Sequence, residues 1–176
     1  MSGCVVVKLG GSFAGSAHLR PWLSAIADAA GRVVLVPGGG PFADVVRSAQ
    51  PAMGYGDRAA HAMALLAMDQ MAHALADIEP RLKPVSSLAG LEALAATGVA
   101  PVWQPGLMAI GADEVEASWA VTSDSLAAWL AGSLKAARLV LVKHAPIRER
   151  GARDLSDAGI VDEALPGMLQ RTGVEA

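Results

Sequence analysis

The sequence predicts an α/β fold in which helices cover both faces of a mainly parallel β-sheet. Its clearest strands are short, continuously apolar runs, which are typical of strands buried on both sides. These runs alternate with segments rich in helix-forming residues, a pattern typical of β-α-β units. Two of the runs end directly in glycine clusters, which directs the search for a functional site to the ends of the strands.

Valine and leucine mark the positions of the strands. Three strands are expected at residues 5–9, 33–36 and 139–143, where these residues dominate. Two shorter strands are expected at residues 85–87 and 101–105. The abundance of β-branched valine favours the extended backbone in each of the three longer runs.

Helices are expected in the segments between these strands. Proline in a first turn and glycine after a last turn support their boundaries. The segment from Asp57 to Asp77 contains no Gly or Pro, so we expect it to be the longest helix. Helices are expected at residues 19–30, 41–49, 57–77, 88–96 and 122–136, with Thr122 as a cap and a loop at residues 106–118.

Length and composition indicate a single globular domain spanning residues 1–176. The apolar fraction of 53% excludes a disordered or fibrous chain. The net charge of −3 argues against a nucleic-acid partner, and the single cysteine, Cys4, excludes a disulfide within the chain. No apolar run reaches the roughly 18 residues of a membrane span, and we see no signal peptide. A cytoplasmic location without a membrane partner is therefore expected.

Both glycine clusters follow apolar strands, at Gly10-Gly11 and at Gly38-Gly39-Gly40. In an open parallel sheet, ligands bind at the carboxyl ends of the strands. Without a Cβ atom, backbone N–H groups can approach an anion closely, and a following helix N-terminus adds a favourable dipole. One such turn alone would most simply be structural. Two indicate that phosphate binds on both sides of a transfer reaction, as donor and as acceptor.

These turns match only one of the common nucleotide-binding patterns. No Walker A sequence occurs, but residues 38–43 fit the dinucleotide fingerprint GxGxxA. That fingerprint expects an acidic residue at the end of the next strand, whereas Asp57 begins a predicted helix. A nicotinamide-dinucleotide-binding domain is therefore an alternative that rests on this match alone.

Three charged residues lie close to the predicted strand ends. Lys8 is inside an apolar strand, where an unpaired lysine is costly; its charge could stabilise a transferring phosphoryl group, or its end could simply reach water. Lys143, at the end of the last strand, could supply a second cation. Asp124, at a predicted helix start, could interact with the helix dipole, position Mg²⁺ or orient the lysines.

Two histidines on the longest predicted helix each lie four residues from an aspartate. His61 follows Asp57, and His73 follows Asp69. Such pairs usually support the exposed surface of a helix. No HExxH or Cys/His ligand spacing occurs, so we predict no metal held by the protein.

Three motifs together resemble the amino-acid kinase family. They are Lys8-Leu9-Gly10-Gly11-Ser12, Val36-Pro37-Gly38-Gly39-Gly40 and Thr122-Ser123-Asp124-Ser125-Leu126-Ala127. They occur in the family's order and at similar separations, and the resemblance covers roughly residues 4–143. It implies a three-layer αβα sandwich and ATP-dependent phosphorylation of a carboxylate, phosphate or carbamate oxygen.

The resemblance also implies roles for individual residues, with ATP and Mg²⁺ as cofactors and no covalent enzyme intermediate. The catalytic residues would be Lys8, Asp124 and Lys143, with Asp124 organising the two lysines. The ATP phosphates would lie against Gly10, Gly11, Ser12 and Ser123. The small-molecule acceptor would lie against Gly38, Gly39, Gly40 and Arg47.

Within the family, residues 57–70 resemble small kinases that phosphorylate aminomethylfuranmethyl phosphate in methanofuran biosynthesis. The same long helix could supply the contact face of a homodimer or larger homo-oligomer, although its pattern fits a core helix equally well. The short segment 144–176 is atypical, because residues 144–147 stand where the family has an Asp-Gly-Val nucleotide loop, and no lysine follows Gly167-Met168 as it does in the family.

The leading hypothesis is thus a small-molecule kinase. The alternative is a catalytically degenerate kinase fold that binds a ligand or a partner subunit.

Overall fold

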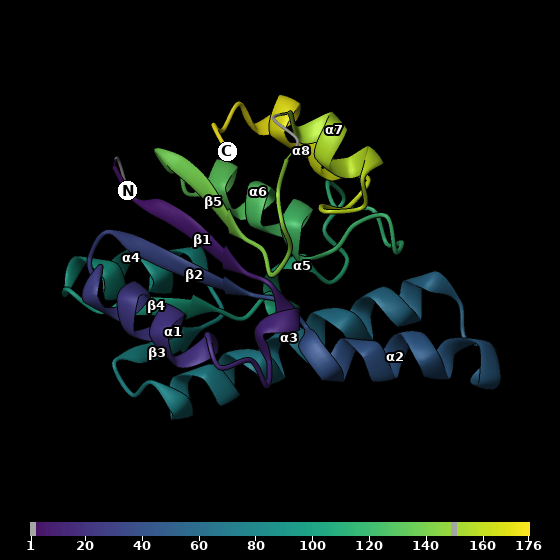
Figure 1. Ribbon diagram of the computed structural model, residues 1–176, viewed down its shortest axis with the longest axis horizontal. Helices are drawn as coiled ribbons and strands as arrows, with labels where there is room; N and C mark the ends of the chain where they lie inside the picture. Colours follow the sequence, from purple (N-terminus) through teal and green to yellow (C-terminus); the bar gives the residue numbers. More distant parts are fainter. Residues whose placement is uncertain (1–2, 149–150) are drawn as a thin grey trace.

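A five-stranded, wholly parallel sheet forms the centre of the computed structural model, which describes residues 3–148 and 151–176 (Figure 1). The strand order is β3-β4-β2-β1-β5. The strands are β1 (Val5–Leu9), β2 (Val33–Pro37), β3 (Leu82–Val85), β4 (Ala100–Trp103) and β5 (Arg138–Val142). The expected parallel sheet is confirmed.

Helices cover both faces of this sheet, which confirms the three-layer αβα sandwich. One apolar cluster joins the sheet to α4, α6 and α8, and a second joins it to α1 and the later part of α3. The helices are α1 (Leu19–Asp28), α2 (Gly40–Met53), α3 (Asp57–Ile78), α4 (Leu88–Ala96), α5 (Gly106–Ala109), α6 (Ser123–Ser133), α7 (Ala152–Asp157) and α8 (Leu165–Thr172), and a 3₁₀ turn covers Gly11–Phe13.

Alternation along the central strands explains why nearly all of their residues are apolar. Val6, Val34 and Val36 face the cluster that contains α6 and α8, whereas Val7 and Leu35 face the cluster that contains α1. Successive strand side chains point to opposite faces. A strand covered on both faces therefore favours apolar residues throughout, and Lys8 in β1 is the exception among these two strands.

Strand β1 lies at the point where the sheet topology reverses. It pairs with β2 on one side and with β5 on the other, so that Lys8 lies opposite Val36 and Leu141. Chain crossovers leave such a point in opposite directions, which opens a crevice at the carboxyl ends of the strands. Helix α2 and the start of α3 extend beyond the sheet near this end (Figure 1). They provide one wall of the crevice.

Several element boundaries differ from the sequence-based expectation. Strand β3 lies at 82–85 rather than 85–87, because Ser87 instead caps α4 by accepting a hydrogen bond from the Gly90 N–H. Helix α2 continues through Pro51, which lies exposed in its last turn. The expected loop at 106–118 begins with the short helix α5, and α6 ends at Ser133 rather than near residue 136. None of the helices in the described ranges is long and apolar enough to span a bilayer.

Trp103 is a core anchor whose truncation should destabilise the fold. It is fully buried at the end of β4, its ring lies 6.0 Å from that of Trp129, and its indole N–H contacts Met108 Sδ. We expect Trp103→Ala to lower the free energy of unfolding by about 3–5 kcal/mol in urea titrations. Trp22→Ala is the control, because Trp22 is largely exposed and should cost less than about 1.5 kcal/mol. Equal losses of unfolding free energy in the two variants would contradict this role for Trp103.

Candidate active site

The two glycine turns lie against each other. A Cβ atom on Gly11 would come within 2.5 Å of the Gly40 nitrogen, and one on Gly38 would collide with the backbone of Gly11. Gly40 also has a φ of +53°, which side-chain-bearing residues rarely adopt. Hydrogen bonds from the Gly38 N–H to Leu9 and from the Gly10 N–H to Val142 hold the turns to the strand ends. Two phosphates held on these turns would therefore be direct neighbours.

Behind the turns, Asp124 bridges two lysines. Its Oδ1 lies 2.7 Å from Lys8 Nζ, and its Oδ2 lies 2.5 Å from Lys143 Nζ. All three side chains are largely buried, with exposed fractions of 5% for Lys8, 4% for Asp124 and 14% for Lys143. Three residues from β1, α6 and the end of β5 are thus brought together. Because two cations face one anion, the triad carries a net positive charge at the strand ends.

Burial and charge act in opposite directions on the titration of this triad. Burial alone would raise the pKa of Asp124, but the adjacent Lys8 and Lys143 ammonium groups outweigh it and lower that pKa. For Lys8, burial lowers the pKa and the positive charge of Lys143 adds to this effect, while Asp124 opposes it. At neutral pH, Asp124 is therefore a carboxylate whose two oxygens are both occupied by lysines. Of the interpretations given above, the orienting role fits this geometry, whereas direct Mg²⁺ ligation does not.

Asp162, a residue of the C-terminal segment, fixes the start of α6. It accepts hydrogen bonds from Thr122 N–H at 2.8 Å, from Ser125 N–H at 3.0 Å and from both of their hydroxyls. The Asp162 N–H in turn donates to Asp124 Oδ2 at 3.3 Å. Thr122 is the N-cap residue of α6, as expected, but its hydroxyl donates to Asp162 instead of accepting from the helix, and this carboxylate satisfies the helix N-terminus. No local pattern in the sequence signals a partner about 40 residues away.

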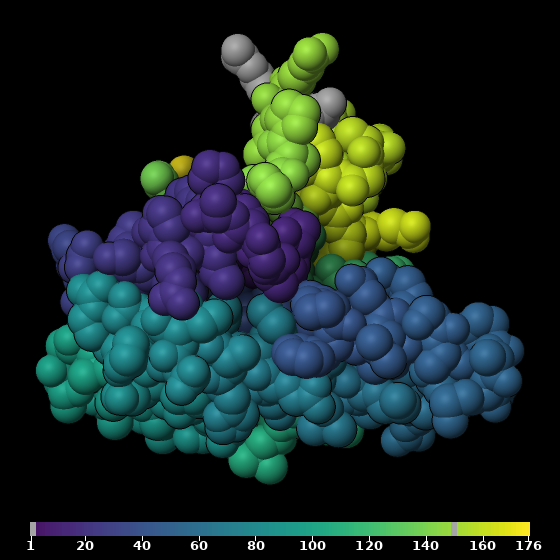
Figure 2. All heavy atoms as spheres, turned by 60° about the horizontal axis from the view of Figure 1, so that its bottom comes forward, coloured from purple at the N-terminus to yellow at the C-terminus, as the bar shows by residue number. Residues whose placement is uncertain are grey.

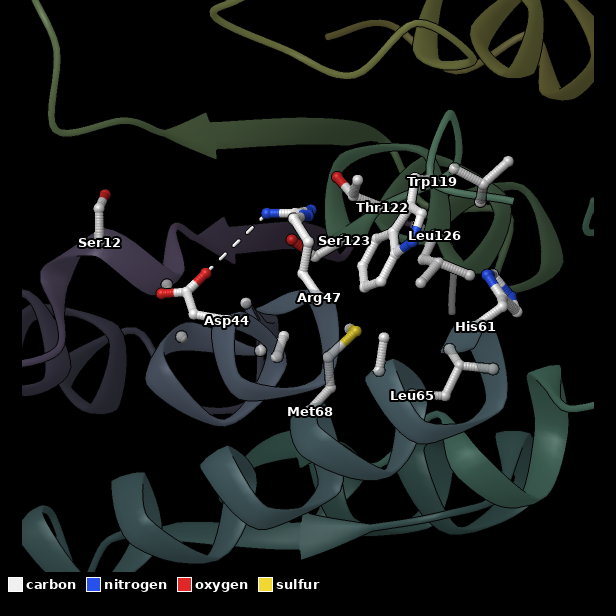
Figure 3. A pocket seen from close by; sticks show the side chains of 17 residues that line it. Ser12, Asp44, Arg47, His61, Leu65, Met68, Trp119, Thr122, Ser123 and Leu126 are labelled. Carbon is white, nitrogen blue, oxygen red and sulfur yellow. Dashed lines mark ion pairs between the residues drawn. The ribbon is translucent and has the colours of Figure 1, made fainter. Parts of the chain in front are cut away.

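A cavity of about 290 Å³ opens beside the glycine turns (Figure 3). Of the residues predicted for binding, seven line it: Gly11, Ser12, Gly38, Gly39, Gly40, Arg47 and Ser123. Gly10 and the three triad residues are not part of this lining, although Gly10 and Asp124 adjoin lining residues in sequence. Apolar side chains from α3 and α6, among them Leu65, Met68 and Leu126, form much of the remaining wall. The cavity therefore joins a polar, anion-binding end to an apolar chamber.

Arg47 and Trp119 form one side of the cavity. The Arg47 guanidinium lies 4.4 Å from the centre of the Trp119 ring, and its contact with Asp44 is long, at 3.9 Å. The Trp119 indole N–H donates to Gln50 Oε1 at 2.7 Å, which fixes the ring. Arg47 was expected at the acceptor, and it does line the cavity. The sequence did not predict a role for Trp119, because no motif singles it out in the stretch before α6.

Of the two histidines of α3, His61 does not form the exposed pair that the spacing predicted. His61 is 93% buried and lines the cavity, while Asp57 instead accepts a hydrogen bond from Gln50. His73 is exposed, contacts Gln104 at 2.9 Å and also interacts electrostatically with Asp69 on its own helix. The i, i+4 spacing describes contacts within one helix only. The packing of α3 against the segment before α6 therefore determines the position of His61 instead.

The C-terminal segment packs on the fold without rebuilding the nucleotide loop of the resemblance. The His144 ring, which follows β5, stacks on Phe13 with ring centres 5.1 Å apart. Arg171, near the position of the family's later lysine, contacts Met168 within α8 and does not line the cavity. Within residues 3–148 and 151–176, no group of three or more His, Cys, Asp or Glu side chains could hold a metal ion.

Comparison with known proteins agrees with this geometry. The family model of the amino acid kinases matches residues 3–163. The chain belongs to the amino acid kinase family. It is 27% identical to the [5-(aminomethyl)furan-3-yl]methyl phosphate kinase of Methanocaldococcus jannaschii, in an alignment that covers 97% of this chain and 85% of that protein. These similarities confirm the expected amino acid kinase resemblance and a phosphoryl-transfer function of the kinase class.

Solved structures show the same fold. The uridylate kinase of Archaeoglobus fulgidus has a TM-score of 0.69 at 19% identity, covering 97% of this chain and 87% of that one. The UMP kinase of Ureaplasma parvum has a TM-score of 0.73 at 14% identity, covering 99% and 88%. At these identities the likeness establishes the amino acid kinase fold. The order of elements removes the sequence-based argument for a nicotinamide-binding domain. That argument needs a strand after α2, whereas helix α3 follows it.

Replacing Asp124 by asparagine tests the charge balance of the triad. The variant leaves two largely buried ammonium groups without a carboxylate, so the free energy of unfolding near neutral pH should fall by about 3–5 kcal/mol. Because the pKa of Asp124 is lowered in the folded state, its contribution is present above the ordinary carboxyl pKa of 3.8 and is lost as pH falls through the folded-state value. Urea titrations should therefore show that the difference in unfolding free energy between the wild type and Asp124→Asn becomes smaller in that acidic range.

A matched control for this experiment is Asp44→Asn, because Asp44 is exposed and has only a long contact with Arg47. It should cause a small change in stability that hardly varies with pH. An Asp124→Asn effect that is equally independent of pH would contradict the ion triad.

Proposed function

We propose that this chain transfers the γ-phosphoryl group of ATP to the phosphate of a small organic phosphate ester. The relative's substrate, aminomethylfuranmethyl phosphate, is the acceptor that we propose, which would place the enzyme in methanofuran-type cofactor biosynthesis. The observation that carries the proposal is the direct apposition of two glycine turns beside a buried, net-positive lysine-aspartate triad. ATP with Mg²⁺ is the proposed donor, and a cytoplasmic location is part of the proposal because the nucleotide is available there.

Donor and acceptor phosphates are assigned to opposite turns in this proposal. Gly10, Gly11, Ser12 and Ser123 would contact ATP, and the turn at residues 38–40 with Arg47 would contact the acceptor. Apposition of the turns supports this division, because transfer needs the two phosphates in line and in contact. Arg47, held over Trp119, could place its planar guanidinium against the acceptor phosphate.

The chemical step requires no general base from the protein. An acceptor phosphate oxygen, already ionised at neutral pH, attacks the γ-phosphorus, and the bond from that phosphorus to the β-phosphate oxygen breaks to release ADP. Negative charge spreads over the transferring group in this transition state. Lys8 and Lys143 would stabilise that charge, while Asp124 fixes both ammonium groups before the reaction begins. Asp124 would thus be a positioning residue.

Lys8→Ala is the direct test of this mechanism. In a coupled assay of ADP release with aminomethylfuranmethyl phosphate, we expect kcat to fall by about 10²- to 10³-fold, because charge stabilisation is lost in the transition state. The control is Lys83→Ala, which removes an exposed lysine from β3 and should leave kcat unchanged. Wild-type turnover in Lys8→Ala would show that Lys8 is structural.

The competing function is that of a catalytically degenerate kinase fold. It is motivated by the stacked His144, which stands where the family carries its nucleotide loop. Calorimetry with ATP and Mg²⁺ separates the two. ATP binding together with acceptor turnover supports the kinase, whereas absence of turnover with every phosphate and carboxylate acceptor supports the degenerate fold.

A homodimer formed through α2 and α3 is the proposed assembly. Phe42 and Val45 from α2, with Met63 and Leu66 from α3, expose apolar surface around a shared groove. Figure 2 shows α2 and α3 on the face turned toward the viewer, with no other segment lying over them. An apolar patch of this kind on a helix pair is typical of a protein contact surface.

Leu66→Arg should therefore shift the protein toward the monomer in sedimentation-velocity measurements, because a buried arginine without a partner opposes association. Ile147→Arg is the control, since Ile147 is equally exposed but lies after β5. A monomeric wild type, or equal effects of the two variants, would argue against this dimer face.

A further inference from the structure

His61, which lines the cavity, carries a buried polar atom that the proposed phosphate chemistry does not use. His61 Nε2 is buried and has no hydrogen-bond partner among the described residues. A buried polar atom without a partner costs free energy, and such atoms are rare in native proteins, where most buried polar groups are hydrogen-bonded. The neighbouring Ser118 Oγ is also without a partner, so this hydroxyl does not satisfy the imidazole.

The surroundings of His61 determine which nitrogen is available and what it can bind. The ring is hydrogen-bonded to the backbone of Ser118, and since Nε2 has no partner, Nδ1 makes that bond as the donor. Burial lowers the pKa of His61, so the ring is neutral at physiological pH. In this tautomer Nε2 carries a lone pair and accepts hydrogen bonds. The end of the cavity at His61 therefore favours an N–H or O–H donor.

The opposite end of the cavity favours an anion. The glycine turns and Arg47 supply N–H donors and positive charge there, and the Asp44 carboxylate at this end lies 3.9 Å from Arg47. In Figure 3, Ser12 and His61 lie on opposite sides of the view, with Arg47, Met68 and Trp119 between them. His61 and Met68 are two turns apart on α3, which corresponds to about 10 Å along the helix axis. A molecule that satisfies both ends must be elongated.

Apolar groups line the middle of the cavity. The Trp119 ring faces a wall that includes Leu65, Met68 and Leu126. Such a chamber suits a small flat ring rather than a charged or heavily hydroxylated body. The cavity thus recognises, in order, an anionic group, an apolar ring and a hydrogen-bond donor.

We propose that His61 is the specificity residue for the acceptor, and that its Nε2 accepts a hydrogen bond from an amino group at the end of the acceptor remote from the phosphate. This inference rests on the proposed function, because it assumes that the acceptor phosphate lies at the glycine turns. A primary ammonium group is the donor that fits best, since a charge-assisted hydrogen bond to a neutral imidazole is strong and adds no repulsion. His61 acts in binding and takes no part in the transfer step.

The test compares two acceptors that differ only in the amino group. These are aminomethylfuranmethyl phosphate and its counterpart in which a methyl group replaces the aminomethyl group. For the wild type we expect a KM for the amine about 10- to 100-fold lower, with similar kcat, because one hydrogen bond to a charged group is involved. His61→Leu should raise the KM for the amine to that of the methyl compound, leaving kcat and the KM for ATP within a few-fold.

Matched variants separate recognition from damage to the fold. His73→Leu removes the other histidine of α3, which contacts Gln104 outside the cavity, and should leave the preference for the amine unchanged. His61→Gln keeps an acceptor and should retain part of the preference. If the His61→Leu variant does not fold, as judged by thermal unfolding, the preference for the amine is compared between the His61→Gln variant and the wild type instead.

Binding measured by calorimetry without ATP distinguishes this inference from the proposed function. Wild-type protein that binds the amine more tightly but transfers no phosphate would support the role of His61 and overturn the kinase proposal. Turnover of both acceptors with equal KM, or a preference that survives in His61→Leu, would overturn the role of His61 and leave the kinase proposal intact. No binding and no turnover of either compound would overturn both.

Discussion

The structure of the site depends on one buried carboxylate between two buried ammonium groups. Asp124 binds Lys8 from β1 and Lys143 from directly after β5, so it ties helix α6 to two adjacent strands of the sheet. Neither lysine could remain charged at this depth without a partner. A triad with two cations and one anion keeps a net positive charge where phosphate oxygens would arrive. The arrangement is thus both a structural clamp and a preorganised electrostatic site.

The C-terminal segment contributes to this clamp from a distance. Asp162 accepts four hydrogen bonds from the start of α6, and its own N–H reaches Asp124. The position of the triad carboxylate is therefore set by residues that follow the last strand. Gly132 of α6 lies so close to Thr172 of α8 that a Cβ atom on Gly132 would collide with the threonine side chain. The short segment after residue 143 consequently has a structural role, although it carries no counterpart of the family's nucleotide loop.

Predictions from the sequence succeeded where the governing interaction is local or repeats along the chain. The apolar strands, the glycine turns and the charged residues Lys8, Asp124 and Lys143 were all identifiable, because burial on both faces and backbone sterics leave a mark at each position. Asp162, Trp119 and His61 were missed, since each takes its role from partners that are 37 to 69 residues away or from a cavity wall. Tertiary packing alone brings such residues together, and spacing within one helix misdirected the interpretation of His61.

The two ends of the site would act on different stages of the reaction. At the glycine turns, charge increases on the transferring group as the transition state forms, so Lys8 and Lys143 interact more strongly there than with bound substrate. At the far end, His61 and the Trp119 wall meet parts of the acceptor whose charge and shape do not change during transfer. Interactions that are equal in the bound and transition states affect KM, whereas those that strengthen in the transition state affect kcat. The separation of the two ends along α3 would therefore let acceptor specificity vary without altering the machinery of phosphoryl transfer.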